Sequence, residues 1–431
     1  MLTIDKINEL IGVEESFHAS YKLTEILENE KERNELFQSF LAIEQDLSFD
    51  WFTEYFQTEH SDRKGKKQDF TPDGIVTLTS ALLSEANSNA DICAGTGGLT
   101  IKRYASNKSA TFYCEEFSDR AIPFLLFNLA IRNINATVCH GDSLTREFKA
   151  IYQLKKSGNF SDIEVVKKPS EFKAQTVIMN PPYSMAWSPE KDWIEQERFK
   201  PYEALAPKSK SDYAFLLQGL SHLDDDGKMA IILPHGVLFR GAAEGTIRKN
   251  ILESNLLDAV IGLPEKAFYN TDIPTVILIL KKNRTNKDVL FIDASKEFTK
   301  QRSHNVIEQQ HIEKIIEGYE GRKEIDKFSY VADLTEIKEN DFNLNIPRYV
   351  DTYEPEPVIP LDQIIGEMQD IDAEIMRQDQ KLAAMMFDLR GTTAQADAEI
   401  KRFTSYFAER AGVNKPRKRK DVTRGEQMRL L

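Results

Sequence analysis

Short β-rich runs alternate with helical patterns between about residues 90 and 300, and this alternation constrains the fold more than any other feature. The runs are ADICA, ATFYCEE, ATVCHGD, TVIMNPP, MAIILPHGVL, LDAVIGLP and TVILILKK. Strands separated by helices usually pair in parallel, because each helical crossover returns the chain to the same edge of the sheet. We therefore predict an α/β fold in which helices flank a mostly parallel sheet.

Outside this alternation the pattern changes. The last run, TVILILKKNR, lies close to VLFIDAS and is expected to supply the antiparallel partner that mixed sheets often carry. Between HGD and NPPY, LTREFKAIYQLKKSGNFSDIEVVKK reads as a charged helix and loop, too short for an inserted recognition domain. The charged, amphipathic residues 4–60 and the residues beyond 300 predict helices.

Composition excludes several classes of protein. With 431 residues, 41% of them hydrophobic, the chain can build a full core. It lacks a membrane-length apolar run and a signal-like N-terminus, so we expect a soluble, cytoplasmic protein with no membrane partner. The cysteines Cys93, Cys114 and Cys139 share no metal-type spacing, which disfavours zinc and disulfides. A net charge of −13 argues against unaided coating of nucleic acid.

A glycine-rich turn joins the first predicted strand to the helix that follows it. In DICAGTGGLT the strand ends at Asp91, and Gly95, Thr96 and Gly97 precede the helix. Glycines let a ligand approach the backbone, and the N-terminus of a helix offers free amides. Taken alone, the turn fits an ordinary tight connection equally well.

The next two strand ends carry carboxylates. Glu115 and Glu116 lie about 20 residues past the glycines, where such folds place an acceptor for ribose hydroxyls. Asp142 ends the strand after that. Each carboxylate alone is more often a turn or cap residue, but three successive strand ends at one edge predict a crevice that fits a nucleoside.

The fourth strand runs into Asn180, Pro181, Pro182 and Tyr183. An amino group on an aromatic ring is a poor nucleophile, because its lone pair is delocalised into the ring. The Asn180 amide oxygen and the Pro181 carbonyl can accept its two hydrogen bonds and favour a pyramidal nitrogen. Tyr183 offers a face on which a flipped base can stack. The alternative is a plain loop.

The residues that follow, 184–212, form a long loop in this interpretation. Trp187, Lys208 and Lys210 could contact a nucleic-acid strand from which the target base is flipped. A mobile surface loop is an equally favoured alternative.

DICAGTGG, CEE, HGD and NPPY, in this order, resemble the motifs of amino-group methyltransferases that use S-adenosylmethionine. The stretch from GKMAIILPHGVLF to TVILILKK, with FIDASKEF, HIEKIIEGY and NDFNLNIPRYVD, closely resembles the modification (M) subunit of type I restriction-modification systems over roughly residues 68–353. The resemblance implies a Rossmann-like sheet and methylation of adenine N6 in DNA. Methylation of protein glutamine or RNA would share NPPY but not AEGTIRKN and NIPRY. A scaffold without activity is disfavoured because the motifs are intact.

The resemblance also implies roles for single residues. The residues it assigns to S-adenosyl-L-methionine are Phe70, Thr71, Asp91, Gly95, Thr96, Gly97, Glu116 and Asp142. Among these, Phe70 and Thr71 would touch the methionine end, Glu116 rather than Glu115 the ribose, and Asp142 the adenine. The catalytic strand end would be Asn180, Pro181, Pro182 and Tyr183. In place of the usual Pro, Ala and Cys after the loop aspartate, this chain has Ile, Cys and Ala.

The implied partners are a specificity (S) subunit, double-stranded DNA with a flipped adenine, a second M subunit and a restriction (R) subunit. The implied regions are an N-terminal helical region (1–67), shorter than is usual in the family, a catalytic domain (68–300), its extension (301–355) and a C-terminal helical region that binds the S subunit (356–431).

A heptad-spaced apolar seam runs through the C-terminal region. Its members are Leu361, Ile364, Met368, Ile371, Ile375, Leu382, Met385 and Leu389, with polar Gln378 as the exception. Gly391 interrupts it, and Thr393 can cap a second helix. A hairpin packed on its own domain fits the pattern equally well, and the resemblance favours a bundle with S-subunit helices. The basic run KPRKRK (415–420) reads as a solvated tail rather than a phosphate site.

Overall fold

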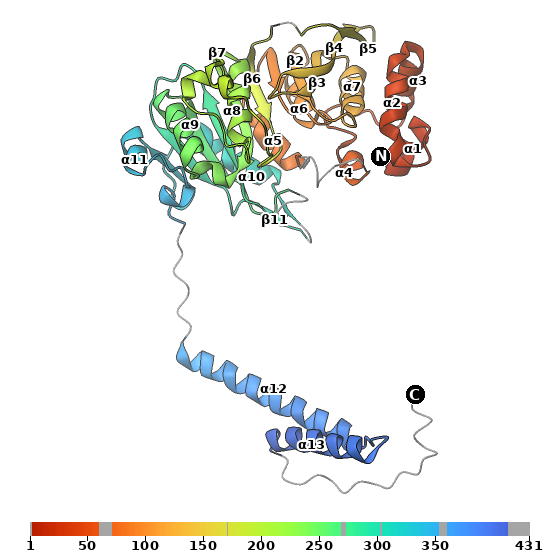
Figure 1. The fold of residues 1–431 in the computed structure, drawn as a ribbon, viewed down its shortest axis with the longest axis vertical. Helices are drawn as coiled ribbons and strands as arrows, with labels where there is room; N and C mark the ends of the chain where they lie inside the picture. The colour runs from red at the N-terminus through yellow and green to blue at the C-terminus, as the bar shows by residue number, and fades with distance from the viewer. Residues whose placement is uncertain are drawn as a thin grey trace. The chain divides into compact units, whose positions relative to one another are not determined.

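The computed structural model describes residues 2–59, 71–169, 171–268, 273–301, 304–352 and 360–412. The chain divides into two compact units, Met1–Tyr353 and Glu354–Leu431 (Figure 1). In the described part of the chain, no helix combines the length and the apolar character needed to cross a lipid bilayer.

Within the described residues, 11 strands of the first unit form one mixed sheet in the order β13-β10-β8-β9-β7-β6-β1-β2-β3-β4-β5. The strands are β1 (Ser88–Asp91), β2 (Thr111–Glu116), β3 (Asn135–Asp142), β4 (Glu147–Ser157), β5 (Phe160–Val166), β6 (Ala174–Met179), β7 (Leu223–Pro234), β8 (Leu257–Gly262), β9 (Thr275–Lys281), β10 (Val289–Asp293) and β13 (Ser329–Ala332). The pairs that join β3, β2, β1, β6 and β7 are all parallel. The predicted α/β fold is confirmed, and its strand order reverses at β1.

The strand TVILILK is antiparallel, as predicted, but it does not pair with VLFID. β9 lies between β7 and β8 and is antiparallel to both, whereas β10 pairs in parallel with β8. Every residue from Thr275 to Leu280 is buried. A strand that is apolar on both faces needs neighbours on both edges and helices above and below, which explains its interior position.

Two antiparallel strands, β4 and β5, occupy the segment predicted as a charged helix and loop, so that prediction is wrong. Buried Ile151 and Leu154 are three residues apart, which imitates helical spacing. Gly158 and Asn159 alone separate the strands, and Gly158 has a φ of +50°. Glycine adopts this conformation without steric cost, and a two-residue loop of this composition is typical of a β-hairpin.

The residues beyond 300 are also not purely helical. β13 pairs with β10 as an antiparallel edge strand. A second, two-stranded sheet joins β11 (Thr299–Lys300) to β12 (Asn305–Val306).

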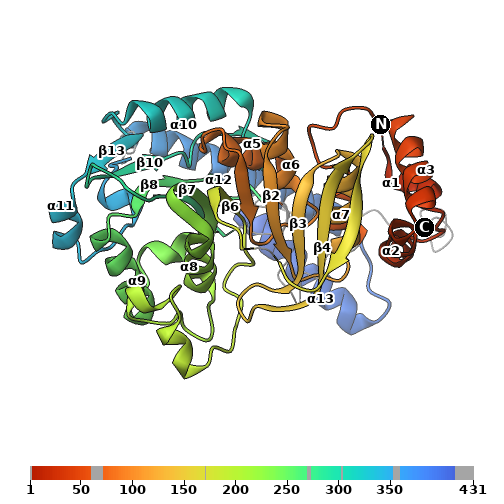
Figure 2. The same ribbon diagram turned by 90° about the horizontal axis from the view of Figure 1, so that it is seen from above.

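Helices cover both faces of the main sheet. They are α5 (Asp73–Ala81), α6 (Gly98–Ser106), α7 (Ile122–Ile131), α8 (Asp212–His222), α9 (Ala242–Glu253), α10 (Gln309–Gly321) and α11 (Leu334–Glu339). Figure 2 shows α5 and α10 on one side of the sheet and α8 and α9 on the other. The apolar side chains of each pair pack into a separate core cluster, since alternate residues of a strand face opposite sides.

The N-terminal helices pack on the part of the sheet that includes β2 and β3, through α7. They are α1 (Ile4–Ile11), α2 (Ala19–Glu28), α3 (Glu30–Leu41) and α4 (Thr53–Glu59). All ten residues of α7, IPFLLFNLAI, are buried, as expected for a helix in which every residue except Asn128 is apolar. Phe37, Phe40 and Phe52 meet Phe127 edge-on, with ring centroids 4.8–5.1 Å apart. This cluster fixes the segment that precedes α4 against α7.

The second unit contains α12 (Leu361–Phe387) and α13 (Ala394–Arg410). Thr393 caps α13, because its hydroxyl accepts a hydrogen bond from the Ala396 amide at 3.2 Å, which confirms the predicted second helix. The two helices contact each other, and Arg410 pairs with Asp379 at 3.1 Å. The seam residues that stay exposed are Leu361, Ile364, Met368, Ile371, Ile375, Leu382, Met385 and Leu389. KPRKRK lies outside the described residues.

Candidate active site

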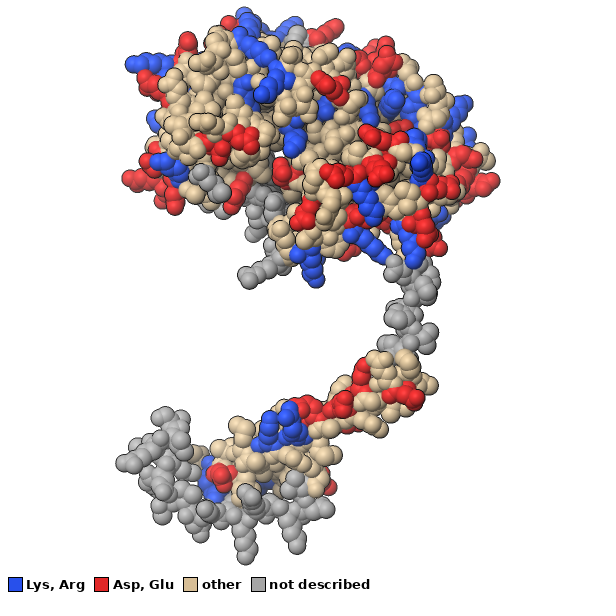
Figure 3. Space-filling view, turned by 180° about the vertical axis from the view of Figure 1, so that it is seen from behind, with Lys and Arg blue, Asp and Glu red and all other residues tan. Residues whose placement is uncertain are grey.

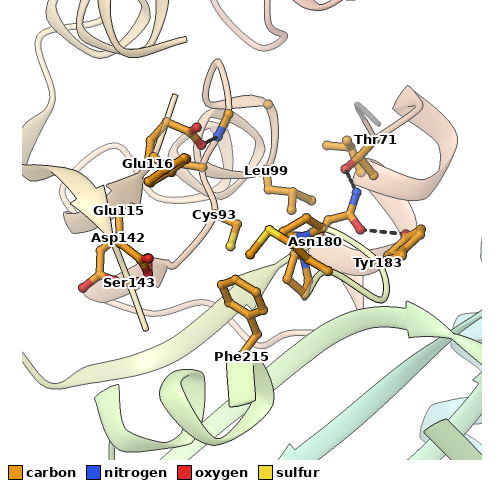
Figure 4. Close-up of a pocket in the computed structure, with 18 of the residues that line it drawn as sticks. Thr71, Cys93, Leu99, Glu115, Glu116, Asp142, Ser143, Asn180, Tyr183 and Phe215 are labelled. Carbon is orange, nitrogen blue, oxygen red and sulfur yellow. Dashed lines mark hydrogen bonds between the residues drawn. The ribbon is translucent and has the colours of Figure 1, made fainter. Parts of the chain in front are cut away.

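The carboxyl ends of β1, β2, β3 and β6 border one cavity of about 360 Å³ (Figure 4). These strands are neighbours in the sheet, and the cavity lies where the strand order reverses, the usual ligand position in open α/β sheets. The predicted site residues that line it are Thr71, Gly95, Glu116, Asp142, Asn180, Pro181, Pro182 and Tyr183. Asp91, Thr96 and Gly97 do not line it, and Phe70 lies outside the described residues.

The glycine turn is held from behind the cavity. The Asp91 carboxylate accepts a hydrogen bond from the Thr100 hydroxyl at 2.9 Å, which ties the end of β1 to α6. Burial raises the pKa of Asp91 to about 7, although the bonds from Thr100 and the Cys93 amide oppose the shift. Gly97 has a φ of +100°, and a Cβ there would lie 3.0 Å from a Leu125 methyl, so both space and conformation require glycine.

Glu116 joins the turn to the second strand. One of its carboxylate oxygens accepts the Gly95 amide at 2.8 Å, and the other accepts the Ser118 amide at 2.7 Å. Glu116 therefore shapes the glycine turn from the end of β2.

Glu115 also lines the cavity, and its own side chain is fully buried. It accepts a hydrogen bond from the Tyr113 hydroxyl at 2.8 Å and pairs with Arg146 at 2.5 Å and with His222 at 3.5 Å. Burial alone would raise the pKa of Glu115, but His222 and Arg146 outweigh it and hold the pKa at about 2. Figure 4 shows Glu115 and Asp142 side by side at the cavity.

The Asp142 side chain stabilises the turn that follows β3. Asp142 accepts the amides of Leu144, at 2.7 Å, and Thr145, at 3.2 Å, through one carboxylate oxygen. Arg198 from the segment 184–212 donates to the Leu144 carbonyl at 2.7 Å. The segment after Tyr183 is therefore bonded to the turn after Asp142.

The Asn180 amide is oriented from two sides. Its nitrogen donates to the Thr71 hydroxyl at 2.9 Å, and its oxygen accepts from the Tyr183 hydroxyl at 2.7 Å (Figure 4). Tyr183 is buried and meets Phe268 edge-on. These contacts hold the amide in one orientation beside the cavity.

Two positions that contact the candidate site escaped the sequence analysis, and both precede the predicted catalytic domain. Asp50 accepts hydrogen bonds from the hydroxyls of Thr96, at 2.5 Å, and Thr53, at 2.8 Å. Its other oxygen accepts from the Asn128 amide at 2.7 Å. Thr53 itself lines the cavity. An aspartate just before a helix is typical of an ordinary cap, so the contact of Asp50 with the glycine turn was not predictable from its position.

The segment 184–212 folds against the domain, and Trp187 is buried rather than exposed. Its ring lies near Trp193 and Phe199, and its indole nitrogen donates to the Pro207 carbonyl at 3.0 Å. Trp187 is thus unavailable for the contact with a nucleic-acid strand that the sequence suggested. Lys208 is exposed.

Comparisons with known proteins identify the family. The N-6 DNA methylase family model matches residues 46–357. The methylase subunit of the type I restriction enzyme MpnII from Mycoplasma pneumoniae is 31% identical over 71% of this chain and 58% of its own length. The methylase subunit of MjaVIII from Methanocaldococcus jannaschii is 29% identical over 80% and 59%. The chain thus spans less than two-thirds of the length of either relative.

Solved structures agree on the fold. A type I restriction-modification system methyltransferase subunit from Streptococcus thermophilus has 33% sequence identity and a TM-score of 0.62, covering 81% of this chain and 80% of its own. A class I S-adenosylmethionine-dependent methyltransferase from Listeria monocytogenes has 16% identity and a TM-score of 0.51, covering 74% and 94%, and shares the fold alone. The predicted Rossmann-like methyltransferase fold is confirmed.

Proposed function

The chain belongs to the N-6 DNA methylase family, and on this basis we propose that it is the catalytic modification (M) subunit of a type I restriction-modification system. It transfers a methyl group from S-adenosyl-L-methionine to adenine N6 in DNA. The observation that carries the proposal is the convergence of Asn180, Pro181 and Tyr183 with Glu116 and Asp142 on one cavity. An amine-holding strand end and acceptors for a nucleoside occur there together.

The residues around the cavity fit the cofactor. Its volume of about 360 Å³ lies in the range of small-molecule sites. The Glu116 and Asp142 carboxylates are acceptors for ribose hydroxyls and an adenine amino group. Asp91, Thr96 and Gly97 hold the turn whose Gly95 faces the ligand. S-adenosyl-L-methionine would supply an electrophilic methyl carbon on its sulfur.

Asn180 and Pro181 prepare the nucleophile. The Asn180 oxygen and the Pro181 carbonyl accept the two N6 protons, and Pro181 and Pro182 restrict the backbone so that this carbonyl direction is fixed. An amide oxygen has two lone pairs, so Asn180 can keep its bond from Tyr183 while it holds the target. A target nitrogen held in this way would present its lone pair to the methyl carbon, and after transfer its surplus proton would leave to water. No titrating base is required.

Target choice is assigned to partner proteins. The charged segment between β3 and β6 is a hairpin of this sheet, and the described residues contain no inserted domain that could read bases. The exposed seam of α12 supports binding of an S subunit. The further partners in this proposal are double-stranded DNA with a flipped adenine, a second M subunit and an R subunit. We keep the four implied regions in this proposal. They are the N-terminal helical region (1–67), the catalytic domain (68–300), its extension (301–355) and the C-terminal helical region that binds the S subunit (356–431).

Methylome sequencing tests the proposal. The gene is expressed in a methylation-free host with and without its neighbouring S gene, and Asn180→Ala is expressed with the S gene as the matched control. We expect N6-methyladenine at one bipartite site only when the wild-type chain and the S gene are both present. Site-specific methylation by the lone chain would contradict the partner claim, and its absence from every strain would contradict the enzymatic one.

A further inference from the structure

The residue after the catalytic strand end has an unusual backbone conformation. Ser184 follows Tyr183 directly, and its φ is +48°, in the left-handed region that residues other than glycine rarely adopt. Such conformations persist only where the surroundings hold them, and they are common at functional sites. The contacts of Ser184 therefore show what fixes the exit from the NPPY turn.

A buried carboxylate holds Ser184. One Asp212 oxygen accepts the Ser184 amide at 2.7 Å, and the other lies 3.4 Å from the Ser184 hydroxyl. Asp212 has no exposed surface and is the first residue of α8, where the helix dipole favours a negative charge. The Ser211 amide donates to the Met185 carbonyl at 2.9 Å, so the two segments are bonded at adjacent positions.

A guanidinium in turn holds Asp212. Arg240 pairs with Asp212 at 2.5 Å and with Glu244 on α9 at 2.6 Å. The backbone carbonyl of Arg240 accepts from the Arg248 side chain at 2.9 Å, and the guanidinium lies against Gly236. The stretch HGVLFRGAAEGTIRKN, which the catalytic motifs leave without a role, contains Gly236, Arg240, Glu244 and Arg248.

We infer that Asp212 and Arg240 are positioning residues for methyl transfer, an inference that rests on the proposed function. They hold Ser184 in its left-handed conformation and thereby aim the Asn180 amide and the Pro181 carbonyl at the target amine. Pro182 and Tyr183 alone lie between the Pro181 carbonyl and Ser184, and the fixed φ of Pro182 limits how the chain can absorb a change at Ser184 before it reaches that carbonyl. A rotation there misplaces a preorganised acceptor, which lowers the rate of the chemical step more than ground-state binding.

The test measures single-turnover methylation by the complex with its S subunit, together with cofactor affinity and thermal unfolding. The variants are Asp212→Asn, Ser184→Gly, the double variant Asp212→Asn/Ser184→Gly, and Ser184→Ala. The control is Asp258→Asn on β8, which disturbs another buried carboxylate that pairs with arginines, Arg284 and Arg322, both at 3.1 Å.

We expect Asp212→Asn to lower the transfer rate at least tenfold while DNA and cofactor affinities change less than twofold. Adding Ser184→Gly to Asp212→Asn should restore at least half of the lost transfer rate on a logarithmic scale, because glycine adopts the left-handed conformation unaided. Ser184→Ala keeps the amide donor and should match the wild type. Asp258→Asn should lower the unfolding temperature and leave the rate unchanged.

Several results would overturn the inference. The first is a wild-type transfer rate in Asp212→Asn. The second is a loss of rate in Asp258→Asn as large as that in Asp212→Asn at an equal loss of unfolding temperature. The third is a double variant whose transfer rate is no higher than that of Asp212→Asn. Where Asp212→Asn fails to fold, Arg240→Lys, which keeps the charge but not the fork of donors, takes its place with the same expectations. A wild-type complex without activity contradicts the proposed function instead.

Discussion

At the scale of single residues, the catalytic strand end depends on how one amide is held. Thr71 and Tyr183 bind the nitrogen and the oxygen of the Asn180 side chain, so the amide is held in one orientation before any target arrives. The sequence predicted that Asn180 and Tyr183 share a site, because they belong to one motif. It could not predict Thr71 as a partner of Asn180, because 109 residues separate the two.

Tyr183→Phe isolates the orienting hydrogen bond, since it keeps the ring and removes only the donor to Asn180. A neutral hydrogen bond contributes about 1 kcal/mol, so we expect the single-turnover rate to fall about fivefold. Cofactor affinity should not change. Equal rates in variant and wild type would show that the hydroxyl plays no part, and a loss as large as that of Asn180→Ala would show that it does more than orient.

Asp91 should leave a signature in the pH dependence of stability. Its pKa is raised to about 7 by burial, against about 3.9 in an unfolded chain. Between these values the folded protein keeps a proton that the unfolded chain has lost, so this residue's contribution makes the free energy of unfolding fall as pH rises from about 4 to about 7.

Urea unfolding at pH 5 and pH 8 checks this expectation. Asp91→Asn can still accept the Thr100 hydroxyl but does not titrate. Relative to this variant, the wild type should lose stability between the two pH values. Parallel changes in both proteins would contradict the raised pKa.

At the scale of elements, apolar strands were predictable and charged ones were not. The runs that became β1, β2, β3, β6, β7, β8 and β9 are buried on at least one face, so hydrophobicity marks them. β4 and β5 are the half-exposed strands at one end of the sheet, with β5 at its edge, and their many lysines and acids indicated a helix. The pair Gly158-Asn159 between two runs was the available signal for a hairpin.

Asp50, in the segment before α4, binds Thr96 of the glycine turn, and a variant of Asp50 tests this contact. Asp50→Ala removes the acceptor shared by Thr96, Thr53 and Asn128. Because buried donors lose their partner, we expect the free energy of unfolding to fall by about 2–4 kcal/mol and cofactor affinity to fall with it. Calorimetric titration and urea unfolding measure the two quantities.

Asp46→Ala is the matched control, because Asp46 is exposed and lies four positions earlier in the same segment. It should cost less than about 0.5 kcal/mol and leave cofactor affinity unchanged. If Asp50→Ala behaved like this control, the segment before α4 would not support the turn.

At the scale of the whole molecule, charge and apolar surface have different roles. Lysine, arginine and acidic side chains are interspersed over the face of the first unit shown in Figure 3. The net charge is −13, and a mixed, net negative surface gives little non-specific attraction to phosphate. In the second unit the seam of α12 is exposed. The seam was predictable from its period, whereas its partner was not, because a heptad pattern does not identify the helix that covers it.

Met368→Glu combined with Ile375→Glu tests the seam. Two carboxylates on an apolar face must be desolvated when a partner helix binds, so we expect the S subunit to be lost from co-purification. Ala373→Glu adds one such carboxylate on another face of α12 and should retain the S subunit. Binding of cofactor by the first unit should be equal in all variants. Retention of the S subunit by the double variant would place its binding site elsewhere.

The most direct test of the account is transfer of a labelled methyl group by Asn180→Ala and by the wild type, each assembled with its S subunit on DNA that carries the target site. We predict that both bind S-adenosyl-L-methionine with the same affinity, and that only the wild type labels adenine N6, with the variant at least about 100-fold slower. Labelling by Asn180→Ala at the wild-type rate would contradict the claim that this strand end holds the target amine.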